Sequence, residues 1–210
     1  SITRIISEEY RLVNVKNIKK YTPGFNIHDI QKKYKIKKVI KLASNENPFI
    51  SDKVLSFIKK PNHKINLYPD SNPNELHKLI ASTIGYRISS DNIILGNGSN
   101  EVLEFIVRAT VDNKSEVIIP KHSFLVYEII SKLQNAKIIT TKPDMNKSTD
   151  NYLGINLEAI IERITKKTKL IFIANPANPT GTYIKLSRIE KFLKSVPKNI
   201  SIIIDEAYYE

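Results

Sequence analysis

The chain has 210 residues, of which 41% are hydrophobic and 26% are charged, as is typical of a globular protein with a substantial core. No apolar run approaches the roughly 20 residues that cross a bilayer, and no signal-peptide pattern opens the chain, so we expect a cytoplasmic protein with no membrane partner. The lack of cysteine excludes disulfides and thiolate metal sites. The four histidines (His28, His63, His77 and His122) show no metal-ligand spacing, so no metal site is predicted.

The formal net charge of +12 raises the question of nucleic-acid binding, because a basic surface gains affinity by releasing phosphate counterions. The lysines are spread over every segment, however, and the whole chain is rich in Lys, Ile and Asn. This distribution indicates a compositional bias at solvated positions, and we expect no nucleic-acid partner. A basic surface would still attract an anionic small molecule to its site.

Residues 1–72 show little regular periodicity, and we interpret them as an amino-terminal arm followed by a small-domain or interface segment. Tyr21 lies beside the turn signal formed by Pro23 and Gly24. A helix is predicted from Ser51 to Lys59, with Ser51 as its cap. Tyr68 follows in a polar loop.

Residues 73–210 alternate between helical and extended patterns, which predicts a domain of the α/β class, mostly parallel sheet with helices on both faces. Its first helix is predicted from Pro73 to Ile84, where Gly85 ends it. The remaining predicted elements are strands at 93–95, 116–120, 137–140, 170–174 and 200–204, and helices at 101–110, 127–133, 157–164 and 187–195. Residues 142–154 are predicted to be a surface loop.

A glycine-rich loop, Gly96–Asn100, precedes the helix predicted at residues 101–110. Small residues let the backbone approach a ligand, and the amides at a helix start favour an anion. The loop therefore resembles a phosphate cradle in outline, although a turn without a ligand would have the same composition. It lacks the glycine of a dinucleotide loop and the Gly-Lys-Ser/Thr of a nucleoside triphosphate loop.

Two apolar strands end in polar motifs near the carboxyl end of the chain. The strand at 200–204 ends in Asp205 and Tyr208, and the strand at 170–174 ends in a loop that contains Asn178. In a parallel sheet these strand ends share one edge, where an α/β protein binds its ligand. The alternative is that Asp205 caps a following helix and that the Asn-Pro pairs are only turns.

These motifs, Asn-Pro-Ala-Asn-Pro-Thr-Gly and Asp-Glu-Ala-Tyr-Tyr-Glu, resemble those of the fold-type-I pyridoxal-phosphate aminotransferases and, within them, the histidinol-phosphate aminotransferase branch. The resemblance covers essentially the whole chain but only somewhat more than half of a family member. It implies the family's large domain, incomplete at the carboxyl end, with pyridoxal 5'-phosphate as cofactor. It also implies a homodimer at full length and a phosphorylated amino-acid substrate.

The resemblance assigns residues to the cofactor. Asp205 would keep the pyridine nitrogen protonated, so that the ring can act as an electron sink. Asn178 and Tyr208 would donate hydrogen bonds to the phenolic oxygen of the ring, and Phe124 would stack on its face. The phosphate group would be held by Gly98, Ser99 and Asn100.

Two tyrosines before the sheet also acquire roles through the resemblance. Tyr68 would bind the cofactor phosphate of the partner subunit; alternatively it is a half-buried turn residue. Tyr21 would contact the substrate; alternatively it is an aromatic side chain packed over the arm. The roles of residues 45–48 and of His122 stay open.

The implied reaction transfers an amino group between histidinol phosphate or imidazole-acetol phosphate and glutamate or 2-oxoglutarate. The family carries its cofactor as a Schiff base on a lysine that we expect beyond Glu210, so we assign no catalytic residue and expect this chain alone to be inactive. The alternatives are another aminotransferase or a phospho-amino-acid decarboxylase of the same fold, or a non-catalytic binding protein with a basic surface.

Overall fold

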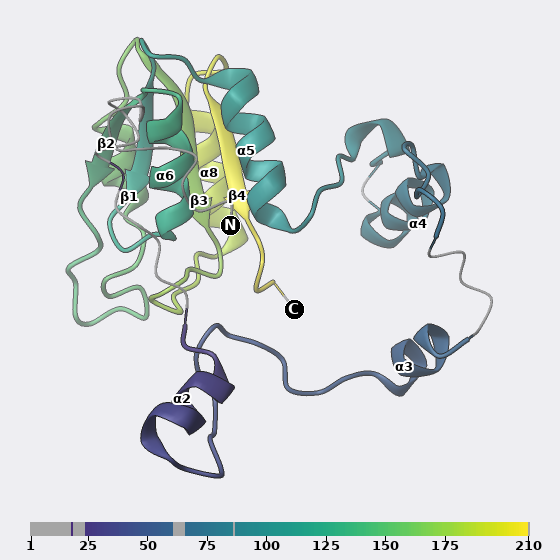
Figure 1. The fold of residues 1–210 in the computed structure, drawn as a ribbon. Helices are drawn as coiled ribbons and strands as arrows, with labels where there is room; N and C mark the ends of the chain where they lie inside the picture. The colour runs from purple at the N-terminus through teal and green to yellow at the C-terminus, as the bar shows by residue number, and fades with distance from the viewer. Residues whose placement is uncertain (1–17, 19–23, 61–65, 86, 210) are drawn as a thin grey trace, which may run out of the picture. The chain divides into compact units, whose positions relative to one another are not determined.

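The computed structural model describes residue 18 and residues 24–60, 66–85 and 87–209 (Figure 1). The described residues form two compact units, one within residues 22–94 and one within residues 95–210. The division after residue 94 differs from the boundary after residue 72 expected from the sequence. The assignment of residues 1–72 to an arm and an interface segment stays a prediction.

The unit of residues 22–94 contains three α-helices and one short 3-10 helix among its described residues. These are α2 (Ile27–Tyr34), α3 (Asp52–Ile58), α4 (Asn74–Ile84) and η3 (Ser90–Asn92). Helices α3 and α4 agree with the predicted helices to within one residue at each end. Gly85 ends α4 with a φ of 72°, a backbone conformation that glycine adopts without strain.

The strand predicted at residues 93–95 is wrong. Ile93 has extended backbone angles, with φ −116° and ψ 130°. In the described part of the chain no strand pairs with this segment, and Ile94 is 68% exposed. An apolar run can favour extended backbone, but a strand also needs a neighbour whose position the local sequence does not encode.

The second unit is built on a parallel four-stranded sheet in the order β2-β1-β3-β4 (Figure 1). Its strands are β1 (Glu116–Pro120), β2 (Lys137–Thr141), β3 (Thr168–Ala174) and β4 (Ser201–Asp205). The predicted α/β class with a parallel sheet is therefore confirmed. The continuous apolar runs of β1 and β3 have the burial expected of strands that are covered on both faces.

Helices pack on both faces of this sheet. The helices are α5 (Ser99–Thr110), α6 (Leu125–Leu133), α7 (Leu157–Ile161) and α8 (Leu186–Ser195). One core cluster joins α5 and α6 to strand residues such as Val117 and Phe172, and the other joins α7 and α8 to Ile118 and Ile171. Because neighbouring strand residues point to opposite faces, each strand contributes to both clusters. None of the described helices is long and apolar enough to cross a membrane.

Three helix ends differ from the sequence-based prediction by two or more residues, one of them the start of α6, which begins two residues before the predicted residue 127. Helix α5 begins at Ser99, two residues earlier than predicted, so Ser99 and Asn100 belong to its first turn. Helix α7 ends at Ile161, whereas the prediction continued to Ile164. The chain turns after Ile161, and the hydroxyl of Thr165 then donates a hydrogen bond of 2.6 Å to Glu116 at the start of β1.

The strand order places a topological switch point between β1 and β3. From β1 the chain passes through α6 to β2, and it then returns to pair β3 on the other side of β1. The loops that leave β1 and β3 lead to helices in different core clusters, α6 and α8 respectively. Loops that diverge in this way leave a crevice at the carboxyl ends of the strands, which is where open α/β sheets bind ligands.

Candidate functional site

A cavity of about 120 Å³ lies at this switch point. It is bounded by the start of α5, the loop after β1, the loop after β3 and the end of β4. Its lining residues are Ser99, Asn100, Phe124, Tyr127, Ala174, Pro176, Asn178, Asp205, Ala207 and Tyr208. The structure therefore brings six of the predicted cofactor residues, Ser99, Asn100, Phe124, Asn178, Asp205 and Tyr208, around one cavity, although they are spread over more than half of the chain.

Asp205 is the carboxylate of this cavity. Its backbone is fixed as the last residue of β4, where it pairs with Ala174, and its carbonyl accepts a hydrogen bond of 2.9 Å from the amide of Asn175. Its Oδ2 accepts a hydrogen bond of 2.6 Å from the hydroxyl of Tyr127, and its Oδ1 accepts one of 3.1 Å from the amide of Ala207. Among the described residues no Lys, Arg or His forms an ion pair with Asp205.

The start of α5 forms a second wall. Gly98 caps this helix with a φ of 76°, a conformation that side chains with a Cβ adopt only under strain. The first amides of any helix have no intrahelical partner, and those of Ser99 and Asn100 begin this one at the cavity. The carboxylate of Glu101 is turned back to the loop, where its Oε2 accepts a hydrogen bond of 2.6 Å from the amide of Asn97. This end of the cavity suits an anion.

Aromatic rings form the third wall. Phe124 and Tyr127 meet edge to face at a centroid distance of 5.8 Å, and Tyr127 stacks on Phe172 at 4.4 Å. Only 1% of Tyr127 is exposed, and this burial, followed by the contact with Asp205, raises the pKa of its hydroxyl far above the ordinary value. The Tyr127 hydroxyl therefore keeps its proton and acts as a donor.

The loop after β3 is held by the buried side chain of Asn175. Its Nδ2 donates a hydrogen bond of 3.0 Å to the carbonyl of Ile184, and its Oδ1 accepts one of 2.7 Å from the Ile184 amide. The loop is closed further by a hydrogen bond of 2.9 Å from the amide of Ala177 to the carbonyl of Thr182. These contacts fix the base of the segment that carries Asn178 to the cavity.

The family model for aminotransferase class I and II matches residues 37–210. The chain belongs to the class I and II aminotransferase family. The match includes the whole sheet and every residue that lines the cavity.

Individual relatives of this chain agree with that family assignment. It is 38% identical over 199 residues to histidinol-phosphate aminotransferase 2 of Carboxydothermus hydrogenoformans, covering 93% of the chain and 52% of the relative. It is 40% identical over 200 residues to the histidinol-phosphate aminotransferase of Desulfotalea psychrophila, covering 94% and 50%. The chain thus spans about half the length of the curated relatives it matches.

Solved structures show the same fold. A crystal structure of histidinol-phosphate aminotransferase from Sinorhizobium meliloti in complex with pyridoxal-5'-phosphate matches with a TM-score of 0.80 and 20% identity. This match covers 99% of the chain and 53% of the solved chain. The predicted aminotransferase fold is confirmed by this likeness.

Three predicted site residues do not line the cavity. Gly98 lies immediately before the first lining residue of α5 and shapes the helix start. Tyr68 belongs to the unit of residues 22–94, in the loop between α3 and α4, and its contribution to a partner's site stays a prediction. Tyr21 lies outside the described residues, so its role as a substrate contact stays a prediction as well.

Two residues of the site, Tyr127 and Asn175, are not among those predicted from the sequence. Tyr127 has the helical spacing of a core residue, and nothing in the local sequence indicates a hydrogen bond to a residue 78 positions away. Asn175 stands in the same motif as Asn178. Its position directly after a buried strand could have indicated that it contributes to the site. The structure distinguishes these two asparagines, because the side chain of Asn175 forms its hydrogen bonds within the chain.

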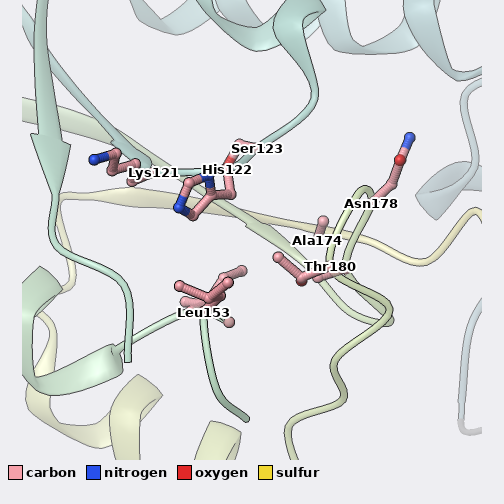
Figure 2. A pocket seen from close by; sticks show the side chains of 10 residues that line it. Lys121, His122, Ser123, Leu153, Ala174, Asn178 and Thr180 are labelled. Carbon is pink, nitrogen blue, oxygen red and sulfur yellow. The ribbon is translucent and has the colours of Figure 1, made fainter. Parts of the chain in front are cut away.

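His122 lies on a neighbouring depression and not in the cavity that contains Asp205. Figure 2 shows His122 in one loop with Lys121 and Ser123, on the side of the depression that faces Leu153. The side chain of Asn178 points away from His122 and Leu153 in this view (Figure 2). The two hollows share Ala174 and Asn178 among their lining residues. His122 is thus separate from the aromatic wall.

Proposed function

We propose that this chain forms the cofactor-binding half of a pyridoxal-phosphate-dependent aminotransferase that acts on histidinol phosphate or imidazole-acetol phosphate with glutamate or 2-oxoglutarate. The observation that carries the proposal is the Asp205 carboxylate, held by two donors at the wall of the cavity and left without a cation in the described chain. A protonated pyridine ring nitrogen would supply that cation.

The residues present fit the cofactor at both of its ends. Asp205 would accept a hydrogen bond from the ring nitrogen, while the amides of Ser99 and Asn100 at the start of α5 would bind the phosphate group. Phe124 offers an aromatic face to the ring, and the Asn178 amide can donate to the ring oxygen. The bound cofactor supplies an electron-withdrawing ring that stabilises negative charge on the substrate carbon.

The direct test uses pyridoxamine 5'-phosphate, because it lacks the aldehyde that would react with the many lysines of this chain. Asp205→Ala should weaken its binding by about 10- to 100-fold, since a hydrogen bond between two charged groups is lost. Isothermal titration calorimetry measures this change, and Asp150→Ala, in an exposed loop, serves as the control. Equal binding by Asp205→Ala and the unaltered chain contradicts the proposal, and no binding at all favours a non-catalytic protein.

The choice of substrate is supported by the curated relatives, which are named histidinol-phosphate aminotransferases and are 38% to 40% identical to this chain. The complete gene product should transfer the amino group of histidinol phosphate to 2-oxoglutarate faster than that of an aromatic amino acid. Release of carbon dioxide from a phosphorylated amino acid, or the reverse preference, would assign it to the alternative activities.

We also propose that the complete enzyme is a cytoplasmic homodimer, in which Tyr68 reaches the cofactor phosphate of the partner subunit. The exposure of large apolar side chains in the unit of residues 22–94 supports an interface there, since Leu42 is 89% exposed and Phe49 is 84% exposed. Sedimentation equilibrium of the complete gene product should give twice the monomer mass. A monomer that binds the cofactor fully would remove the need for Tyr68 of a partner.

A further inference from the structure

Tyr127 combines the packing of a core residue with the contact of a site residue. Its ring is buried between Phe172, on which it stacks, and Phe124, which it meets edge to face. Its hydroxyl reaches past this apolar packing to Oδ2 of Asp205 at 2.6 Å. The packing fixes the ring, so the hydroxyl donates from a position that the side chain cannot readily leave.

The hydroxyl of Tyr127 and the amide of Ala207 donate hydrogen bonds to different oxygens of the Asp205 carboxylate. Each binds one oxygen of Asp205, at 2.6 Å and 3.1 Å respectively, so both oxygens are held in place. A carboxylate oxygen can accept more than one hydrogen bond, and capacity therefore remains on the side of the cavity. Burial and the neighbouring carboxylate raise the pKa of Tyr127, so the donor keeps its proton.

We propose that Tyr127 is a positioning residue that holds the Asp205 carboxylate in place and aimed at the ring nitrogen of the cofactor. This inference rests on the proposed function and adds a second residue to its electrostatics. A side chain needed only for packing could equally be phenylalanine, because the stacked ring would remain. The hydroxyl is what the proposal requires.

The test compares Tyr127→Phe with Tyr183→Phe, whose side chain is 56% exposed and does not line the cavity. Two ligands are titrated by calorimetry: pyridoxamine 5'-phosphate and its analogue in which a carbon replaces the ring nitrogen. Tyr127→Phe should weaken the first ligand by about 10-fold, as expected for a lost hydrogen bond to a charged group, and leave the second within about twofold. Tyr183→Phe should change neither.

A double-mutant cycle separates a positioning role from a structural one. In an Asp205→Ala background, Tyr127→Phe should cost no further affinity, because the hydroxyl acts only through the carboxylate. Equal losses for both ligands, or the same loss in the Asp205→Ala background, would show that Tyr127 merely supports the fold. If Asp205→Ala weakens binding and Tyr127→Phe does not, this inference fails while the proposed function stands. If Asp205→Ala has no effect, both fail.

Discussion

Two carboxylates, one at the amino ends of the parallel strands and one at the carboxyl ends, have similar partners but different surroundings. Glu116 begins β1 and Asp205 ends β4, and each accepts a hydrogen bond of 2.6 Å from a hydroxyl, Thr165 in the first case and Tyr127 in the second. The second oxygen of Glu116 accepts from the ammonium of Lys137 at 2.9 Å. Within the described residues, the second oxygen of Asp205 accepts only from a backbone amide, beside a cavity.

On this difference we base the proposal that Asp205 binds a ligand and that Glu116 serves the fold. Glu116 has its cation within the chain, because Lys137 is its register partner on β2. Asp205 has no such cation among the described residues, yet it lies at the carboxyl edge where parallel strands present their ligand groups. A partly buried charge with a missing counter-ion indicates where a cationic ligand group belongs.

At the carboxyl edge of the sheet we expect some polar side chains to stabilise the fold and not to bind a ligand. Asn175→Ala should lower the free energy of unfolding by about 2–4 kcal/mol, because it leaves the amide and the carbonyl of Ile184 without their buried partner. Urea unfolding followed by circular dichroism measures this loss. It is the largest stability effect that we expect from a polar residue near the site.

Asn178→Ala is the matched control for Asn175→Ala, since it removes the same side chain three residues later in the same loop. No hydrogen bond of the Asn178 side chain is found within the described part of the chain, so its loss should change the free energy of unfolding by less than about 0.5 kcal/mol. Affinity for pyridoxamine 5'-phosphate should fall instead. Equal destabilisation by the two substitutions would contradict the division into structural and ligand-binding polar groups.

The sequence predicted the sheet well because burial on both faces leaves a strong local signal. The apolar runs of β1, β3 and β4 placed these strands to within two residues, and the motif after each of the last two placed Asn178 and Asp205 at one edge. Pairing was harder to predict, as residues 93–95 show. That segment has strand-like residues and no partner strand in the described chain.

Two side-chain contacts that escaped prediction, one in the site and one outside it, join residues far apart in the sequence. The hydroxyl of Tyr127 and the carboxylate of Asp205 are 78 residues apart, and the ion pair between Glu116 and Lys137 depends on the register of β1 with β2. Residue type alone gave Glu116 no more significance than any other acidic residue. Packing decides which of these side chains meet.

The amino edge provides the second test. Glu116→Gln should lower the free energy of unfolding near neutral pH by about 1 kcal/mol, because Lys137 is 71% exposed and its attraction to the carboxylate is screened by water. The hydrogen bond from Thr165, and then that from Lys137, lower the pKa of Glu116 below its ordinary 4.5. The charge therefore stabilises the fold above pH 4.5, and this contribution is lost as the pH falls through the lowered pKa.

Urea unfolding at a series of pH values measures this dependence. The difference between the unaltered chain and Glu116→Gln should be constant above the ordinary pKa of 4.5 and shrink in more acidic solution. Lys137→Met removes the cation and keeps the length of the side chain, so it should reproduce part of the loss. A difference that grows toward acid would show that Glu116 is not stabilised as a carboxylate.

The smallest effect on stability is expected for Asp205→Asn, although it removes a carboxylate from a comparable position. The Asn oxygen can still accept the hydrogen bond from Tyr127, and the amide of the exposed Ala207 can bind water, so the free energy of unfolding should change by less than about 0.5 kcal/mol. Affinity for pyridoxamine 5'-phosphate should fall far more than in Glu116→Gln. A loss of stability in Asp205→Asn as large as that in Glu116→Gln would mean that both carboxylates maintain the fold. The two carboxylates would then differ only in their position in the sheet. The cavity beside Asp205 would no longer be supported as the binding place of a cationic ligand group.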